Sequence, residues 1–312
     1  MMLRAIVEGI RTAAFRKKRQ AIHERAAAAR HGLLEAGGSG LLVADIQQYR
    51  ARGPNGDYTI FVTLPSEPPP KAGYPVLWLL DGNAWVAGAA EALRLQSRFA
   101  IQSEIEPVIL VAVGYPGAEP FDMGRRAYDY LPKHASGKLS ERFMQGAPWH
   151  QPGGADAFLD FLAGPLREDI AERYPVDAKR QILCGHSFGG FFALHALLNR
   201  PSAFARYAAL SPALWWDDGR LMKEADAAMA ALPRDLAADV LIAVGGRETP
   251  DRPKISARMA EDACAFADRL TGEALAGVTV ECRVLAEENH QSLLTAIFPT
   301  VLRFATAKGV RA

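Results

Sequence analysis

A glycine-rich segment in the middle of the chain constrains the fold more than any other part of the sequence. It reads Gly185-His186-Ser187-Phe188-Gly189, which fits the pattern G-x-S-x-G. The preceding residues (QILC) are typical of a strand, and the following ones (GGFFALHALL) are typical of a helix. A serine on a sharp strand-to-helix turn is lifted above the sheet, and small neighbours keep the chain from colliding with itself. The segment predicts a nucleophile elbow, and the alternative is a glycine-rich turn without catalysis.

Strand-like and helix-like segments alternate around this turn. Short apolar runs predict strands buried on both faces, and longer amphipathic runs predict helices. The predicted strands are Asp57–Leu64 (an antiparallel lead-in), Tyr74–Leu80, Pro107–Val113, Arg180–Cys184, Tyr207–Leu210, Val240–Val244 and Val278–Leu285. The predicted helices are Glu91–Ala100, Ala157–Arg173, Gly190–Leu198, Gly219–Ala231, Ser256–Leu270 and Ser292–Ala307. This order indicates an α/β fold with a mostly parallel sheet and right-handed crossovers.

The chain divides into an N-terminal extension and one catalytic domain in this interpretation. Residues 1–35 carry eight Lys or Arg and three Glu, a net charge of +5, whereas the other 277 residues carry 28 basic and 32 acidic side chains, a net charge of −4. We therefore expect a basic extension over residues 1–36 and an α/β domain over 37–312. Residues 114–154 interrupt the alternation, and a loop of that length is usually functional. They are expected to form an insertion near the active site.

Composition excludes several classes of protein. The formal net charge of +1 argues against a nucleic-acid binder, which normally carries a basic excess. Three cysteines without metal-type spacing argue against a disulfide framework and a zinc site, so no metal or cofactor is expected. No apolar signal-peptide core and no transmembrane helix stand out, which favours a cytoplasmic protein over a periplasmic one. The basic extension is interpreted as a solvated helical arm, with membrane contact as the less favoured alternative. The sequence does not indicate an oligomeric state.

A serine nucleophile needs a base, and in this kind of fold the order along the chain is serine, acid, histidine. His290 follows the last predicted strand and is the candidate base. Glu248 follows the preceding strand and is the candidate acid, which would orient the imidazole. Asp251, three residues later, is the alternative acid.

Acyl transfer also requires donors for the oxyanion, and the candidates are two backbone N–H groups. One belongs to Phe188, directly after the nucleophile, and the other to Asn83 in the turn Asp81-Gly82-Asn83. A plain Asp-Gly turn is the alternative for the second.

Two further pairs of side chains are candidate substrate contacts. Arg125 and Arg126 lie in the insertion and could bind an anion, or they form a solvated charge pair. Trp215 and Trp216 follow a strand end at the ligand-binding edge of the sheet, so they could stack on rings or belong to the core.

Several segments together resemble the putative esterase branch of the α/β-hydrolases, and within it the trilactone siderophore esterases. The segments are YPVLWLLDGNA (Tyr74–Ala84), RRAYDYLP (Arg125–Pro132), GGADAFLDFL (Gly153–Leu162), GHSFGGFFALHALL (Gly185–Leu198), SPALWW (Ser211–Trp216) and NHQS (Asn289–Ser292). The resemblance covers about residues 40–307 and implies the α/β-hydrolase fold. It also implies hydrolysis of the ester bonds of enterobactin, salmochelin or bacillibactin through an acyl-enzyme. Some relatives use a Ser–His dyad, so Glu248, Asp251 or no acid completes the site.

The resemblance leaves three hypotheses about function. The favoured one is a serine carboxylic-ester hydrolase whose small-molecule substrate is a siderophore trilactone. In that case Arg125 or Arg126 would meet the anionic ligand, and Trp215 or Trp216 would meet its rings. The second is an S-formylglutathione hydrolase or a general carboxylesterase. The third, a non-catalytic ligand-binding relative, is disfavoured because the chain keeps both Ser187 and His290.

Overall fold

The computed structural model describes residues 46–133, 151–249, 258–271, 275 and 277–307. All of them belong to the compact unit Val43–Ala312. The predicted basic extension, the alternative acid Asp251 and residues 134–150 of the predicted insertion lie outside the described residues. The boundary predicted near residue 36 therefore stays a prediction.

The described strands form one sheet with the order β1-β2-β4-β3-β5-β6-β7-β8. The strands are β1 (Ile46–Gly53), β2 (Gly56–Thr63), β3 (Tyr74–Leu80), β4 (Ile109–Gly114), β5 (Val176–His186), β6 (Arg206–Leu210), β7 (Ala238–Gly245) and β8 (Val278–Leu285). β1 and β2 are antiparallel to their neighbours. The other six strands, β3 to β8, are parallel to one another. The predicted α/β class and mostly parallel sheet are confirmed.

The helices connect these strands, as the alternation predicted. They are α2 (Gly82–Ser97), α3 (Ala100–Ser103), α4 (Met123–Tyr130), α6 (Ala155–Ala163), α7 (Pro165–Arg173), α8 (Phe188–Asn199), α9 (Trp216–Ala230), α10 (Met259–Leu270), α11 (Leu293–Ala296) and α12 (Phe298–Thr306).

Four local expectations differ from the structure. The sequence did not predict β1, because this edge strand is polar and only partly buried (IQQYRARG). The predicted helix 157–173 is two helices, since Gly164 interrupts it and Pro165 begins the next one. The predicted C-terminal helix 292–307 is likewise divided into α11 and α12. The helix α2 begins nine residues before its predicted start, directly at the turn after β3.

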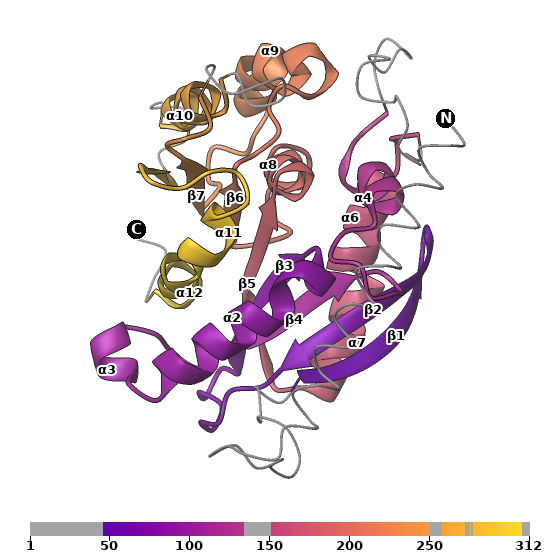
Figure 1. Cartoon of the computed structure of the whole chain (residues 1–312), viewed down its shortest axis with the longest axis vertical. Helices are drawn as coiled ribbons and strands as arrows, with labels where there is room; N and C mark the ends of the chain where they lie inside the picture. The colour runs from indigo at the N-terminus through magenta and orange to yellow at the C-terminus, as the bar shows by residue number, and fades with distance from the viewer. Residues whose placement is uncertain (1–45, 134–150, 250–257, 272–274, 276, 308–312) are drawn as a thin grey trace, which may run out of the picture. The chain divides into compact units, whose positions relative to one another are not determined.

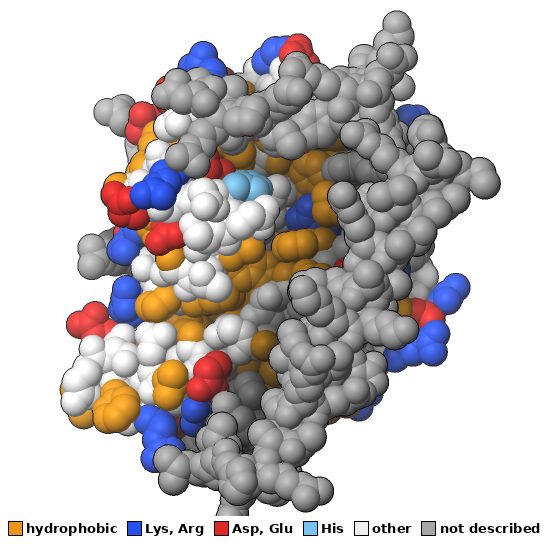
Figure 2. Space-filling model, in the orientation of Figure 1, with side chains coloured by type: hydrophobic (Ala, Val, Ile, Leu, Met, Phe, Trp, Pro, Cys, Tyr) orange, Lys and Arg blue, Asp and Glu red, His pale blue; other side chains and the backbone are white. Residues whose placement is uncertain are grey.

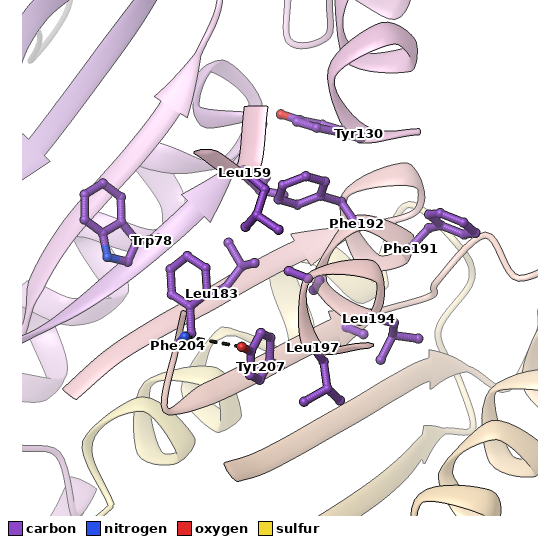
Figure 3. Close-up of a cluster of buried hydrophobic side chains, with 14 of the residues drawn as sticks. Trp78, Tyr130, Leu159, Leu183, Phe191, Phe192, Leu194, Leu197, Phe204 and Tyr207 are labelled. Atoms are coloured by element: carbon purple, nitrogen blue, oxygen red, sulfur yellow. Dashed lines mark hydrogen bonds between the residues drawn. The ribbon is translucent and has the colours of Figure 1, made fainter. Parts of the chain in front are cut away.

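The sheet separates two layers of helices. Every residue of β3 is buried, and its side chains alternate between the two sides: Trp78 joins the larger core cluster, whereas Leu77 and Leu79 join the smaller one. The larger cluster includes side chains of α6, α7, α8, α9 and α10, and the smaller one includes α2, α11 and α12. Figure 1 shows these helices around the sheet, and Figure 3 shows part of the larger cluster.

The described part of the predicted insertion contains α4. Its first turn is capped by Asp122, whose side chain accepts a hydrogen bond from the N–H of Arg125. The helix packs against α6 and α8, so it lies beside the helix that follows the predicted nucleophile. No helix among the described residues is long and apolar enough to cross a membrane.

Candidate active site

The predicted elbow is a sharp turn between β5 and α8. Ser187 has φ 59° and ψ −113°, a conformation that a non-glycine residue adopts only under strain. A Cβ at position 185 would lie 2.3 Å from the carbonyl oxygen of Gly189, and one at position 190 would lie 2.7 Å from that of Leu210. Glycine is therefore required at both positions by the close approach of the backbone. The turn is held by a 2.9 Å hydrogen bond from the Ser187 N–H to the Leu210 carbonyl.

The structure brings the predicted acid and base together. The Nδ1 of His290 lies 2.7 Å from Oε2 of Glu248, across the ends of β7 and β8. Glu248 as a residue is 2% exposed, and the other oxygen of its carboxylate accepts hydrogen bonds from Ser211 Oγ at 2.5 Å and Gly245 N–H at 2.8 Å. Ser211 and Gly245 thus fix a buried carboxylate, and its second oxygen fixes the orientation of the imidazole.

The imidazole of His290 lies next to the elbow. Its ring centroid is 4.4 Å from that of His186, the residue before the nucleophile. The hydrogen bond that His290 makes is to Glu248, and none joins it to Ser187 Oγ within the described part of the chain. Catalytic hydrogen bonds of this kind often form only when substrate is bound. The side chain of His290 is 29% exposed, whereas that of its partner Glu248 is 1% exposed. Figure 2 shows a histidine at the surface beside a group of hydrophobic side chains.

His186, at the variable position of the elbow, is buried beneath this histidine. It contacts the edge of the Trp85 ring, with the centroids 5.7 Å apart. Burial lowers the pKa of His186 well below its usual range, and the neighbouring His290 and Arg126 lower it further. A neutral imidazole therefore supports the ring of His290 at neutral pH.

The candidate site has two halves: the elbow with Glu248 and His290, and the turn after β3 that contains Asp81 and Asn83. Asp81 adopts the left-handed conformation (φ 55°, ψ 47°) directly before α2, so the N-terminal N–H groups of this helix begin at the turn. The side chain of Asn83 pairs with the backbone of Tyr115, accepting from its N–H at 2.8 Å and donating to its carbonyl at 2.9 Å. These bonds fix the turn against the end of β4, and the predicted role of the Asn83 N–H as an oxyanion donor stays a prediction.

Arg126 joins the two halves of the site. It forms two 2.8 Å hydrogen bonds to the two oxygens of Asp81, and it donates at 3.3 Å to the carbonyl of His186. The residue is 3% exposed. Burial by itself lowers the pKa of Arg126, but Asp81 raises it overall. This guanidinium is therefore buried and paired within the protein, and the substrate contact that the sequence suggested for Arg126 stays a prediction.

Arg125 also has partners within the protein. Its guanidinium donates to the backbone carbonyls of Asp57 at 2.6 Å and Asn55 at 2.7 Å, and it lies over the rings of Tyr58 and Tyr115. These contacts tie α4 to the turn between β1 and β2. The solvated charge pair considered from the sequence is therefore absent for both arginines.

The two tryptophans lie against the residue that follows the nucleophile. The Phe188 ring is 5.9 Å from Trp215 and 5.8 Å from Trp216, measured between centroids. Trp216 is 4% exposed and belongs to the core, whereas Trp215 is only partly buried. Of the two, Trp215 is thus the less buried.

Sequence reasoning named Ser211, Asp81 and His186 within their segments but gave none of them a role in the site. Ser211 directly follows β6 and Asp81 directly follows β3, so their positions at strand ends were the available signal. No group of His, Cys, Asp and Glu that could hold a metal ion occurs among the residues that the structure describes.

Comparison with known proteins agrees with this geometry. The model of the "Putative esterase" family matches residues 51–299. The chain is 35% identical to the ferri-bacillibactin esterase BesA of Bacillus subtilis, over 84% of this chain and 89% of that protein. A BES protein from Bacillus cereus has a TM-score of 0.75 at 28% identity, covering 88% of this chain and 99% of that one. The siderophore hydrolase EstB from Aspergillus nidulans has a TM-score of 0.70 at 26% identity, covering 86% and 98%. The chain therefore belongs to the "Putative esterase" family and is an esterase.

Proposed function

We propose that this esterase hydrolyses the ester bonds of a trilactone catecholate siderophore, with Ser187 as nucleophile, His290 as base and Glu248 as the orienting acid. The observation that carries the proposal is the 2.7 Å contact between His290 and a buried glutamate, beside a serine on a strained elbow. The substrate class is supported by the similarity to esterases and hydrolases of siderophores.

The geometry supports acyl transfer in two stages. His290 takes the proton of Ser187 as the hydroxyl oxygen attacks the ester carbonyl, and Glu248 stabilises the imidazolium that forms. The backbone N–H groups of Phe188 and Asn83, each at the start of a helix, would stabilise the oxyanion. The imidazolium then protonates the leaving alcohol, and a water molecule hydrolyses the acyl-enzyme with His290 again as base. In a trilactone the leaving hydroxyl belongs to the same ring, so the first turnover opens the macrocycle.

The positive charge for an anionic ferric complex does not come from Arg126 in this proposal, because Asp81 neutralises it. The partly buried Trp215, packed on Phe188 beside the nucleophile, is the proposed contact for an aromatic catecholate.

Mass spectrometry of the products tests both the chemistry and the substrate class. The enzyme is incubated with ferric and iron-free forms of enterobactin and bacillibactin, with S-formylglutathione and with a p-nitrophenyl ester. We expect linearised trilactone from the wild type and no product from Ser187→Ala, which should keep the wild-type circular dichroism spectrum. Full turnover by Ser187→Ala would contradict the nucleophile. A preference for S-formylglutathione would contradict the siderophore substrate and favour the thioesterase alternative.

A further inference from the structure

Two of the three cysteines lie side by side on the surface. Cys264 on α10 and Cys282 on β8 are 18 residues apart in sequence, and their sulfur atoms are 3.2 Å apart. Both are free thiols; Cys282 is exposed and Cys264 is partly exposed. A disulfide has an S–S distance of about 2.04 Å, so the two sulfurs would have to move about 1.2 Å closer to form one.

The pair joins the edge of the sheet to the helix that covers it. Among the described strands, β8 is the last one in the sheet and pairs with β7, where Cys282 is opposite Ile242. The chain leaving β8 carries His290, which contacts Glu248 from the end of β7. A bond between α10 and β8 would therefore restrain the strand that leads to the candidate base.

We propose that Cys264 and Cys282 are a modification site, at which a reversible intramolecular disulfide forms by exchange with a small-molecule disulfide such as oxidised glutathione. The thiolate of one cysteine attacks a sulfur of oxidised glutathione and releases one glutathione thiolate, which gives a mixed disulfide. The second cysteine loses its proton and attacks the protein sulfur of that mixed disulfide, releasing the second glutathione. In total the two protein thiols lose two electrons and two protons, and one oxidised glutathione becomes two reduced glutathiones.

The surroundings of the thiols set the conditions of the reaction. Burial, the neighbouring Cys264 and Asp268 together raise the pKa of Cys282 to about 12. Since only the thiolate attacks, exchange at neutral pH is slow and incubation takes hours. The third cysteine, Cys184, is 0% exposed on β5 and provides an internal control, because burial also raises its pKa to about 12 and it is closed to the reagent.

Alkylation and mass spectrometry of the native protein test the site. After equilibration with excess oxidised glutathione, we expect the wild type to lose the mass of two hydrogen atoms and to yield one peptide pair that links Cys264 to Cys282. Dithiothreitol should reverse both changes. Cys282→Ser should stop at a mixed disulfide or remain unmodified, and Cys184 should stay reduced. The proposal is refuted if both thiols can still be alkylated, if the wild-type protein keeps stable glutathione adducts, or if a covalent dimer forms on a non-reducing gel.

Thermal inactivation tests the proposed restraint on β8. Closing a loop of this size should raise the Tm of the oxidised wild type by roughly 5–10 °C and lengthen the half-life of its esterase activity on heating. The matched control is Cys282→Ser treated with the same reagent, for which no such gain is expected. If the oxidised wild type contains the Cys264–Cys282 link but its Tm is unchanged, the proposed restraint on β8 is refuted.

Discussion

Replacing Arg126 tests whether its ion pair with Asp81 holds the two halves of the candidate active site in register. The guanidinium makes two 2.8 Å hydrogen bonds to Asp81, before the oxyanion turn, and one of 3.3 Å to the His186 carbonyl, before the nucleophile. The two side chains are 4% and 0% exposed. Solvent therefore provides almost no screening, and a partner left alone is a buried charge.

The expected magnitudes follow from this burial. Arg126→Met leaves Asp81 unpaired, and breaking a buried pair typically costs about 3–5 kcal/mol in the free energy of unfolding. The double variant Asp81→Asn/Arg126→Met removes both charges, and asparagine tolerates the left-handed conformation at position 81. We expect the double variant to regain most of the lost stability. Its kcat should stay low by about 10²–10³-fold, the typical effect of losing an oxyanion donor, since nothing then links the turn to the elbow.

Urea denaturation and steady-state kinetics with a p-nitrophenyl ester measure the two effects separately. The decisive result is kcat in the double variant, because its fold is restored. If this variant has wild-type kcat, Arg126 contributes only to stability and the positioning role is refuted. If Arg126→Met keeps full stability, the reasoning from buried charge is refuted instead.

Three further predictions concern the surroundings of the site. Glu248→Gln should lower kcat by about 10²–10⁴-fold with little change in KM, because the imidazole loses its anionic partner; a loss below tenfold would favour a Ser–His dyad. Ser211→Ala should have a smaller effect, of about tenfold, since the Gly245 N–H still donates to the same oxygen of Glu248; a loss as large as that of Glu248→Gln would contradict this ranking. Burial raises the pKa of Asp129 from 3.8 to about 6, so the folded protein binds its proton more tightly and the free energy of unfolding should fall by about 2 kcal/mol as pH rises from 4 to 6. Asp129→Asn should remove that contribution in urea denaturation across this pH range. If the free energy of unfolding of the variant falls with pH as steeply as that of the wild type, the pKa of Asp129 is not raised.

The sequence by itself predicted the strands β2 to β8, the elbow and the order of the catalytic candidates along the chain. Strands such as Tyr74–Leu80 are buried on both faces, so their apolar runs are continuous and their bounds are readable from the sequence. The elbow glycines were readable for a similar reason, since a Cβ at position 185 would collide with the backbone of the next turn. In each case a local constraint on one short segment selects the residue type.

Only the tertiary structure decided which polar groups meet. Arg126 pairs with Asp81 across 45 positions, and Glu248 meets Ser211 across 37 and His290 across 42. The sequence predicted Glu248 and His290 from their places after strands, but it did not predict Ser211, and it suggested a ligand for Arg126. A buried charge requires a partner, yet the sequence does not show which one, because any strand end at the same edge of the sheet can supply it. The pairing is set by the lateral order of the strands in the sheet, and that order exists only once the chain has folded.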